Sequence, residues 1–506
     1  MGEDKVILVR NKIESFLRNK YGLILIGILL FSFIIRIVYF LKTYNQPMWW
    51  DEAEYFSIAK SMLGIVPYEY PIQRPVLFPL LIALFYSFTH SEAFVRFMVV
   101  LLPSVGCVFM TYLVGKSLYN KRVGLIASFI MSVFWVLMFN TFRVHTDALA
   151  LLFGLLAVYF FWEGYVKKKD TKYLVLMGLF IALGFLVRLS TALIIMIVLI
   201  YLLLTDKFKF VTEKKVWYSG GIFILLLLPY LIWNYFKFGN FLAFFSGYVG
   251  TQEFAQKAVK PFAWQVFSYF KLYTQDLFFY LFLIGLVILL IDLILGFDIL
   301  IKKGDRRLKA HLFTFLLIAF PTIYFTFIER SAGEPRWLML IAPGMFFVIG
   351  LALIQIYKFV KKYNKTIALV AVLVLVALGG YSELKYSGFI INNKIESYLP
   401  VKLTGLFIKD NSLESDIVLS HSVPQNTYYS ERKTVGVIEP SSEFEEKIKQ
   451  LKPRYLVLSV FEIHSEEVLS YPEKYQSILK PVQAYFADAE QTQPVLVVYG
   501  FTGYEF

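Results

Sequence analysis

Cysteine is almost absent from this chain of 506 residues, because Cys107 is the only one. A single thiol excludes an intramolecular disulfide framework and a thiolate metal site. Charged residues are also scarce, at 17% of the sequence. The segment after residue 381 contains neither a G-x-G-x-x-G fingerprint nor a P-loop, so nothing in it indicates a nucleotide-binding domain.

Hydrophobic residues are abundant instead, at 58% of the sequence, and the mean hydropathy is +0.62. A soluble protein of this composition would expose too much apolar surface, so we predict a polytopic α-helical membrane protein. The formal net charge of +13 does not indicate nucleic-acid binding, because the basic residues occur in short clusters between apolar runs.

Apolar runs of roughly 20 residues, long enough to cross a bilayer, number about eleven. They lie at residues 21–41, 94–116, 123–142, 147–166, 172–188, 190–206, 216–235, 277–300, 310–328, 337–357 and 365–381. The first run is too long for a signal peptide and is predicted to be a retained anchor. The run 75–88 has only about 14 residues and is predicted to be re-entrant or interfacial.

The basic clusters between these runs predict the orientation. We expect the protein to lie in the plasma membrane. If its N-terminus is in the cytoplasm, every dense basic cluster falls in a cytoplasmic loop. These clusters are Lys116/Lys121/Arg122, Lys167/Lys168/Lys169, Lys207/Lys209/Lys214/Lys215, Lys302/Lys303/Arg306/Arg307/Lys309 and Lys358/Lys361/Lys362/Lys365. The first loop, residues 43–93, and everything after residue 381 are then extracytoplasmic.

The composition changes near residue 382, which divides the predicted transmembrane domain, 1–381, from a small soluble extracytoplasmic α/β domain, 382–506. Short β-branched runs predict strands at residues 416–420, 434–437, 455–459 and 494–499. Helical stretches are expected near 400–409 and 442–451.

The first outer loop begins with an acidic and aromatic stretch, Trp49-Trp50-Asp51-Glu52-Ala53-Glu54-Tyr55. One interpretation is structural: the aromatic residues form an interfacial belt, while Asp51 and Glu54 make a capping box at N-cap and N3. The other is that Asp51 or Glu52 is a catalytic base at the membrane surface. The following residues, 51–64, have the spacing of an amphipathic helix that lies on the membrane with a polar side away from it.

Arginines are concentrated at the predicted outer helix ends, where lysine is rare. They are Arg36, Arg74, Arg96, Arg143, Arg188, Arg330 and Arg336. Arginine is suited to bidentate recognition of phosphate or carboxylate, so an anionic ligand that enters from the outer leaflet would explain them. The structural alternative is that each arginine snorkels to the interface or pairs with an acid.

The link Arg143-Val144-His145-Thr146-Asp147 places a base, an imidazole and a carboxylate between two spans. Asp147 is either a helix cap or a functional residue. His145 alone does not make a metal site, because only Asp51, Glu52 and Asp147 are at hand as further ligands, and a structural histidine is the favoured interpretation.

Together these features resemble the GT-C membrane glycosyltransferases, and more narrowly the branch that includes protein O-mannosyltransferases and the lipid A aminoarabinose transferase. The resemblance covers residues 1 to 360. It rests on Asp51-Glu52, Arg74-Pro75, Arg96 at the start of the second span, the Arg143–Asp147 link and Glu334-Pro335-Arg336-Trp337. The eukaryotic mannosyltransferases differ, because they have His-Pro in place of Arg74-Pro75 and a large luminal insertion. The acceptor of those enzymes therefore cannot be assumed for this chain.

The resemblance implies a polyprenyl-phosphate-linked sugar as donor and Asp51, with Glu52 beside it, as the base. It implies phosphate binding by Arg96 and Arg336. We assign Arg188 and Arg74 to the same group of donor-binding arginines, and we assign Arg143, His145 and Asp147 to substrate binding.

The predicted reaction is an inverting transfer of a hexosyl or pentosyl group to a protein, glycan or lipid acceptor. Guanidinium groups can stabilise the departing phosphate, so no cofactor is required, and a divalent metal is not favoured. Two alternatives remain: a transporter or flippase of lipid-linked sugars, and a membrane sensor or scaffold. Against the transporter, the spans contain few charges and no internal repeat is evident.

Overall fold

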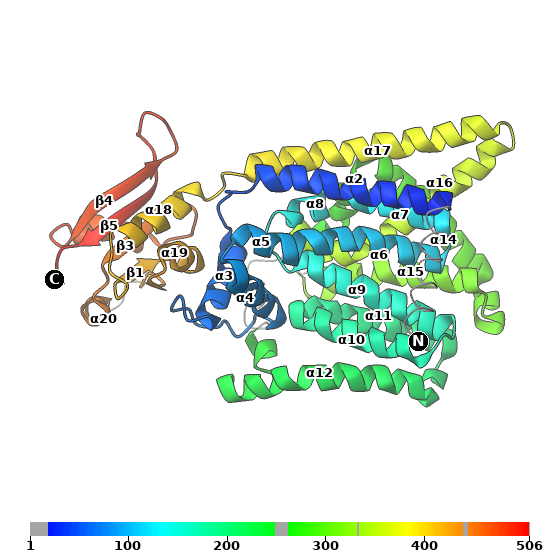
Figure 1. Ribbon diagram of the computed structural model, residues 1–506, viewed down its shortest axis with the longest axis horizontal. Coiled ribbons are helices and arrows are strands. Elements are labelled where there is room, and N and C mark those ends of the chain that lie inside the picture. Colours follow the sequence, from blue (N-terminus) through cyan, green and yellow to red (C-terminus); the bar gives the residue numbers. More distant parts are fainter. Residues whose placement is uncertain (1–18, 248–261, 331–332, 439–443, 505–506) are drawn as a thin grey trace, which may run out of the picture. The chain divides into compact units, whose positions relative to one another are not determined.

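The computed structural model describes residues 19–247, 262–330, 333–438 and 444–504 (Figure 1). The helices of its membrane part are α2 (Lys20–Lys42), α3 (Trp50–Met62), α4 (Leu77–Thr89), α5 (Glu92–Arg96), η1 (Phe97–Leu101), α6 (Leu102–Leu118), α7 (Lys121–Val133), α8 (Trp135–Thr141), α9 (Asp147–Phe161), η2 (Trp162–Val166), α10 (Thr171–Val187), η3 (Leu189–Ala192), α11 (Leu193–Asp206), η4 (Lys209–Thr212), α12 (Lys214–Phe238), η5 (Trp264–Phe267), α14 (Ser268–Lys303), α15 (Arg306–Ile323), η6 (Tyr324–Ile328), η7 (Pro335–Ile341), α16 (Ala342–Lys361) and α17 (Lys365–Lys394). The remaining elements are α18 (Leu399–Asp410), β1 (Ile417–Ser420), α19 (Val423–Ser430), β2 (Lys433–Val435), α20 (Phe444–Leu451), β3 (Tyr455–Ser459), α21 (Glu466–Leu469), α22 (Tyr471–Lys474), β4 (Leu479–Phe486) and β5 (Pro494–Phe501).

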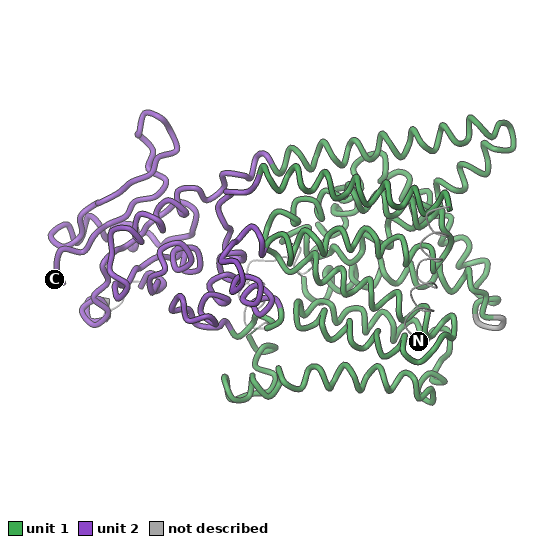
Figure 2. The backbone as a smooth tube through the Cα atoms, viewed as in Figure 1, with its two compact units in different colours: residues 1–42, 72–77, 96–391 green, residues 43–71, 78–95, 392–506 purple. Residues whose placement is uncertain are grey.

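The chain forms two compact units (Figure 2). The first contains residues 1–42, 72–77 and 96–391, and the second contains residues 43–71, 78–95 and 392–506. Most of residues 43–93 therefore form one unit with the C-terminal residues. The helix α17 continues to Lys394, beyond the composition change at residue 382, so that change does not coincide with the end of a helix.

The first unit is a bundle of apolar helices. Within the described residues, nine helices are long and apolar enough to cross a membrane, and the bent pair α7 and α8 makes a tenth. The helix α10 is equally apolar but shorter. These eleven segments correspond to the eleven predicted runs, which confirms a polytopic helical fold. The short run before residue 89 is the 13-residue helix α4, too short to cross a bilayer at about 1.5 Å per residue.

Arg36 lies in α2 and is fully buried. Its Nε donates to Ser104 Oγ at 2.7 Å, and its Nη1 donates to Ser32 Oγ at 2.7 Å and to the carbonyl of Ser132 at 2.9 Å. These bonds join α2 to α6 and α7. The expectation that Arg36 belongs with the ligand-binding arginines is therefore not supported, because serine and carbonyl groups of the bundle already bind its guanidinium.

A bend of 51° separates α7 from α8 at Phe134. Trp135 is the first residue of α8, and its backbone N–H donates to Oε2 of Glu383 at 3.1 Å. Glu383 comes from α17 and is fully buried. The first N–H groups of a helix have no acceptor within the helix, so this side-chain oxygen of Glu383 stabilises the start of α8.

We expect Glu383→Ala to lower the free energy of unfolding by about 1–3 kcal/mol, because it leaves a buried N–H without its acceptor. Glu383→Gln retains an acceptor oxygen and should be much less destabilising. Thermal unfolding of the purified chain in detergent measures both variants. Equal melting temperatures for Glu383→Ala and the unmodified chain would contradict this role.

The second unit contains a five-stranded sheet of order β2-β1-β3-β5-β4. The strands β2, β1 and β3 are parallel, whereas β5 is antiparallel to both β3 and β4. Four of these strands agree with the predicted ones. The edge strand β4 was not predicted, since its sequence, LKPVQAYF, contains a proline and does not alternate regularly. Its pairing with β5 is interrupted by register shifts at Pro481/Gln483 and Tyr485/Phe486.

Both faces of this sheet are buried. On one face, Val418 and Val457 pack with Val401 and Ile408 of α18. On the other, Leu419 and Leu456 pack with a second group of apolar residues that includes Ile448 of α20. Adjacent residues of a strand point to opposite faces, so the sheet lies between two helical layers and the unit is a small α/β structure, as predicted.

The helix α3 packs against α19 in the second unit. Ser57 Oγ donates to the carbonyl of Pro424 at 3.1 Å, and Lys60 Nζ lies 3.1 Å from Oε1 of Glu431, directly after α19. The predicted helix exists, but the expectation of an exposed polar side is wrong. Ser57 and Lys60 are buried because they bind α19 and the residue that follows it, and Glu52 is buried where it accepts the N–H of Trp49.

This contact should weaken in acid. Burial alone would raise the pKa of the Glu431 carboxyl, but its ion pairs with Lys409, at 2.7 Å, and Lys60 outweigh burial and lower the pKa. A lowered native-state pKa gives stability that is complete above the ordinary pKa of glutamate and is lost as the pH falls through the lowered value. Both ion pairs then lose their acidic partner.

We therefore expect Glu431→Gln to lower the melting temperature at pH 7 and to have a smaller effect near pH 3. The energy involved is about 1 kcal/mol or less, because the pairs are partly exposed. Thermal unfolding of the full chain between pH 7 and pH 3 tests this expectation. Glu446→Gln, on an exposed side chain of α20, is the control. A difference in melting temperature that is independent of pH would contradict the assignment.

Candidate active site

Three charged side chains that are distant in the sequence meet in the first unit. Asp147 is the first residue of α9, and its Oδ1 lies 2.9 Å from Nη1 of Arg188. Nη1 of Arg336 lies 3.8 Å from the other carboxylate oxygen, Oδ2. The Asp147 side chain is 2% exposed and that of Arg336 is 11% exposed. Two guanidinium groups thus share one buried carboxylate, and Arg336 also pairs with Glu334, whose side chain is partly exposed.

Arg188 is positioned by the end of a helix. It follows Val187, the last residue of α10, and its backbone is extended, with φ −156° and ψ 122°. Its Nε donates to Ser190 Oγ at 3.1 Å and its Nη1 donates to Thr146 Oγ1 at 3.1 Å. These hydroxyl groups and the Asp147 carboxylate hold the guanidinium in one orientation, as a preorganised binding group requires.

Arg336 is positioned by the start of another helix. Pro335 opens η7, where its fixed φ and missing N–H are compatible with a first helical turn. Tyr273 donates its hydroxyl hydrogen to the carbonyl of Pro335. The Nε of Arg336 lies 2.6 Å from Oε2 of Glu334, so this guanidinium is held between Glu334 and Asp147.

A small cavity of about 30 Å³ adjoins the three charged residues. Its polar lining comes from Asp147, Arg188, Arg336 and Ser190, and its apolar lining includes Trp337. Guanidinium groups beside apolar walls suit an anionic group that is attached to a hydrophobic body.

The link before α9 is buried. Arg143 is 1% exposed and His145 is 2% exposed. His145 Nδ1 lies 3.0 Å from Oδ1 of Asn140 in α8. The guanidinium of Arg96 contacts the start of this link, since its Nη1 donates to the carbonyl of Phe142 at 3.4 Å. The structure therefore places Arg96 beside the 143–147 link.

Arg74 lies in the short segment 72–77 of the first unit and is half-buried. The next residues of this segment, Val76 and Leu77, pack on a core of Leu186, Tyr230 and Phe244. The segment is thus attached to α10 and α12, which gives Arg74 a fixed base.

Asp51 and Glu52 lie in the first turn of α3, in the second unit. The structure corrects the predicted capping box, because Trp49 is the N-cap residue and Glu52 is N3. Oε2 of Glu52 accepts the backbone N–H of Trp49 at 2.8 Å, and Glu52 is 2% exposed. Glu52 therefore holds the start of the helix, whereas Asp51 remains half-buried one position before it.

Sequence reasoning missed Thr146 and Ser190, which hold Arg188, Asn140, which contacts His145, and Glu383, which accepts the N–H of Trp135. A signal was present, since each is a polar residue inside or beside an apolar run. Within the described ranges, no three histidine, cysteine, aspartate or glutamate residues are grouped closely enough to hold a metal ion.

Comparison with known families gives one match. The model of a family described as dolichyl-phosphate-mannose-protein mannosyltransferase matches residues 73–233. The matched region contains Arg74, Arg96, the link 143–147 and Arg188. No curated protein sequence matches the chain.

Solved membrane transferases have the same fold. The archaeal oligosaccharyltransferase AglB from Archaeoglobus fulgidus, in complex with an inhibitory peptide and a dolichol-phosphate, has a TM-score of 0.62 and 13% identity over 88% of this chain and 70% of that chain. ArnT from Cupriavidus metallidurans in the apo state has a TM-score of 0.63 and 12% identity over 93% of this chain and 97% of that chain. The same protein bound to undecaprenyl phosphate has a TM-score of 0.60, with 11% identity over 93% and 98%. The predicted GT-C fold class and the resemblance to this branch are confirmed.

Proposed function

We propose that the chain is a glycosyltransferase that uses a polyprenyl-phosphate-linked sugar as donor. The observation that carries this proposal is the cluster of Arg188 and Arg336 around Asp147 beside a cavity with an apolar wall. Two oriented guanidinium groups match the phosphate of such a donor, and apolar walls match the start of its lipid. The likeness to ArnT bound to undecaprenyl phosphate and to AglB in complex with a dolichol-phosphate supports this ligand class.

The proposed reaction is a single displacement at the anomeric carbon. An acceptor hydroxyl oxygen forms a bond to that carbon while the bond from the carbon to the phosphate oxygen breaks, with inversion. Asp51 takes the hydroxyl proton, and the polyprenyl phosphate leaves with its charge stabilised by arginine. Asp51 lies in the first turn of α3, where the helix dipole favours a carboxylate.

We assign Arg96 and Arg74 to the donor side with Arg188 and Arg336, and we assign Arg143, His145 and Asp147 to substrate binding. No cofactor is needed for this chemistry, because arginine supplies the positive field. The acceptor is a hydroxyl of a protein, a glycan or a lipid. The proposed location is the plasma membrane, with the N-terminus in the cytoplasm and the second unit outside, as the lysine clusters predict.

The test is sugar transfer from a radiolabelled polyprenyl-phosphate hexose or pentose by the purified full-length chain, with and without EDTA. We expect donor consumption that EDTA does not abolish. If the protein binds the donor and moves it across vesicle membranes without consuming it, the function is that of a flippase instead. Binding without turnover or movement would favour a sensor.

A further inference from the structure

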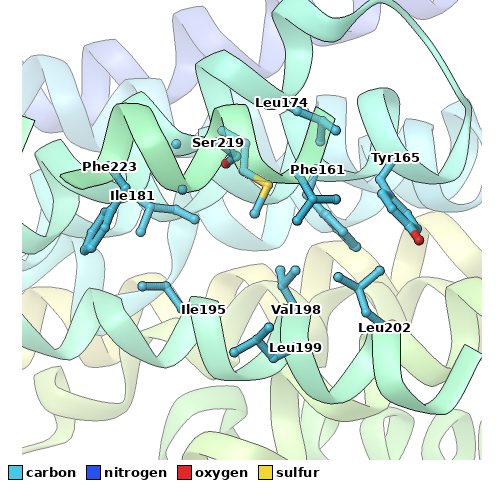
Figure 3. Close-up of a pocket in the computed structure, with 14 residues that line it drawn as sticks. Phe161, Tyr165, Leu174, Ile181, Ile195, Val198, Leu199, Leu202, Ser219 and Phe223 are labelled. Atoms are coloured by element: carbon cyan, nitrogen blue, oxygen red, sulfur yellow. The ribbon is translucent and has the colours of Figure 1, made fainter. Parts of the chain in front are cut away.

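Two cavities in the first unit, at the end of the bundle that carries lysine-rich loops, are distinct from the cluster around Asp147. The first has a volume of about 180 Å³ and lies between α10, α11 and α12. Its lining is almost entirely apolar, and Figure 3 shows side chains of α11 such as Ile195 and Val198 facing Phe161 and Ile181. Leu174 and Ile181, both on α10, are seven residues apart, so the cavity extends about 10 Å along the helices.

The second cavity has a volume of about 420 Å³ and is polar. Four lysines line it, Lys168, Lys209, Lys215 and Lys309, together with only two carboxylates, Asp206 and Glu213. Its net charge is therefore positive. Two lysines close by, Lys167 and Lys169, both pair with Glu163. None of the four lining lysines forms an ion pair with another residue that the structure describes.

The two cavities adjoin, because Tyr165 and Leu174 line both of them. In Figure 3, Tyr165 lies at one end of the apolar cavity and Phe223 at the other. The basic cavity therefore meets the apolar one at the Tyr165 end. A molecule that occupied both would have an anionic group at one end and an apolar chain at the other.

We propose that the two cavities form a binding site for an anionic glycerophospholipid. Its phosphate lies among the four lysines, and one acyl chain lies between α10, α11 and α12. Basic pockets between membrane helices bind anionic lipid headgroups in this way, and each lysine near the phosphate strengthens the attraction. The site lies on the face of the bundle that carries the lysine-rich loops, so it does not depend on the proposed sugar transfer.

The chain offers a matched pair of steric variants. Gly220 lines the apolar cavity, and its neighbour Gly221 does not. A Cβ at either position would meet no atom within 4 Å, so both positions can accept a side chain without backbone strain at the Cβ. Gly220→Leu should occupy part of the space of the acyl chain, whereas Gly221→Leu should leave that space open. A matched charge control also exists, because Lys214 is adjacent to Lys215 but does not line the basic cavity.

The experiment titrates the delipidated full-length chain with phosphatidylglycerol and, separately, with phosphatidylcholine, and measures binding by native mass spectrometry. We expect saturable binding of phosphatidylglycerol that is at least about 10-fold tighter than that of phosphatidylcholine. The triple variant Lys209→Gln/Lys215→Gln/Lys309→Gln should bind phosphatidylglycerol roughly 100-fold more weakly. Gly220→Leu should weaken binding by about 10-fold, while Lys214→Gln and Gly221→Leu should match the unmodified chain.

Three results would overturn the proposal. The first is equal binding of the two lipids. The second is an effect of the triple lysine variant no larger than that of Lys214→Gln. The third is displacement of the lipid by glycerol 3-phosphate together with no effect of Gly220→Leu, which would identify a site for a soluble phosphate ester. Melting temperatures of all variants show whether any loss of binding reflects unfolding.

Discussion

Asp51→Asn should lower the rate of sugar transfer by roughly 100- to 10,000-fold, the range that positioned acid–base groups contribute. Asparagine has nearly the same shape as aspartate but cannot accept the proton of the acceptor hydroxyl. Asp51 lies in the first turn of α3 and does not hold the cap, so the substitution should leave the helix folded. The loss should therefore fall on kcat, with donor binding nearly unchanged. Initial rates with a radiolabelled lipid-linked sugar measure this effect.

Two carboxylates of the same loop are controls for Asp51. Glu69 is exposed, so Glu69→Gln should retain full activity. Glu52→Gln preserves an oxygen that can accept the N–H of Trp49, so its effect should be far smaller than that of Asp51→Asn. If Glu52→Gln lost as much activity as Asp51→Asn with an unchanged melting temperature, Glu52 would be the base. Undiminished turnover by Asp51→Asn would exclude Asp51 from that role.

Arg336→Ala should weaken binding of the donor and of free polyprenyl phosphate by roughly 10- to 100-fold, the value of one or more hydrogen bonds to a charged group. Its guanidinium lies beside the cavity next to Asp147 and is held there by Glu334. Arg336→Lys keeps the charge but loses the planar fork, so it should recover only part of the affinity. Titration with undecaprenyl phosphate measures these changes without any turnover.

Removal of Arg336 also leaves Asp147 with fewer cationic partners, which could destabilise the bundle. The variant Arg336→Ala/Asp147→Asn separates the two effects, because it removes the buried negative charge as well. We expect it to regain stability but not phosphate affinity. Arg330→Ala is the matched control, since Arg330 precedes Arg336 by six residues and is exposed. Unchanged affinity in Arg336→Ala would assign the phosphate to other residues.

Hydropathy predicted most of the membrane part. Each of the eleven apolar runs is helical, the run 123–142 as the bent pair α7 and α8, because a backbone in hydrocarbon must form its hydrogen bonds within helices. The strands at 455–459 and near 417–420 were predicted for a similar reason, since buried parallel strands are short and rich in β-branched residues. The strand β4 was missed because only its pairing with β5, across two register shifts, makes it a strand.

The charged residues were harder to interpret. Asp51 and Glu52 are equivalent in sequence, and the φ of −81° and ψ of 172° at Trp49 decide that Glu52 forms the cap. Arg36 and Arg188 are both arginines in or beside apolar runs. Three helices surround Arg36 with serine and carbonyl oxygens, while Arg188 lies at a helix end beside a carboxylate and a cavity. The spacing of residues in the sequence predicts neither the polar surroundings of Arg36 nor the position of Arg188 beside a carboxylate and a cavity.

The amino-acid sequence by itself determined that the chain is a membrane protein, where its spans lie and that an α/β sheet follows them. Those properties depend on local composition and periodicity, which decide directly whether a segment crosses a bilayer or packs on a sheet. Only the tertiary structure decided that Arg188 and Arg336 share Asp147, that α3 packs on α19 and that two cavities adjoin at Tyr165. Contacts between distant residues depend on how helices pack, and packing is a property of the whole fold.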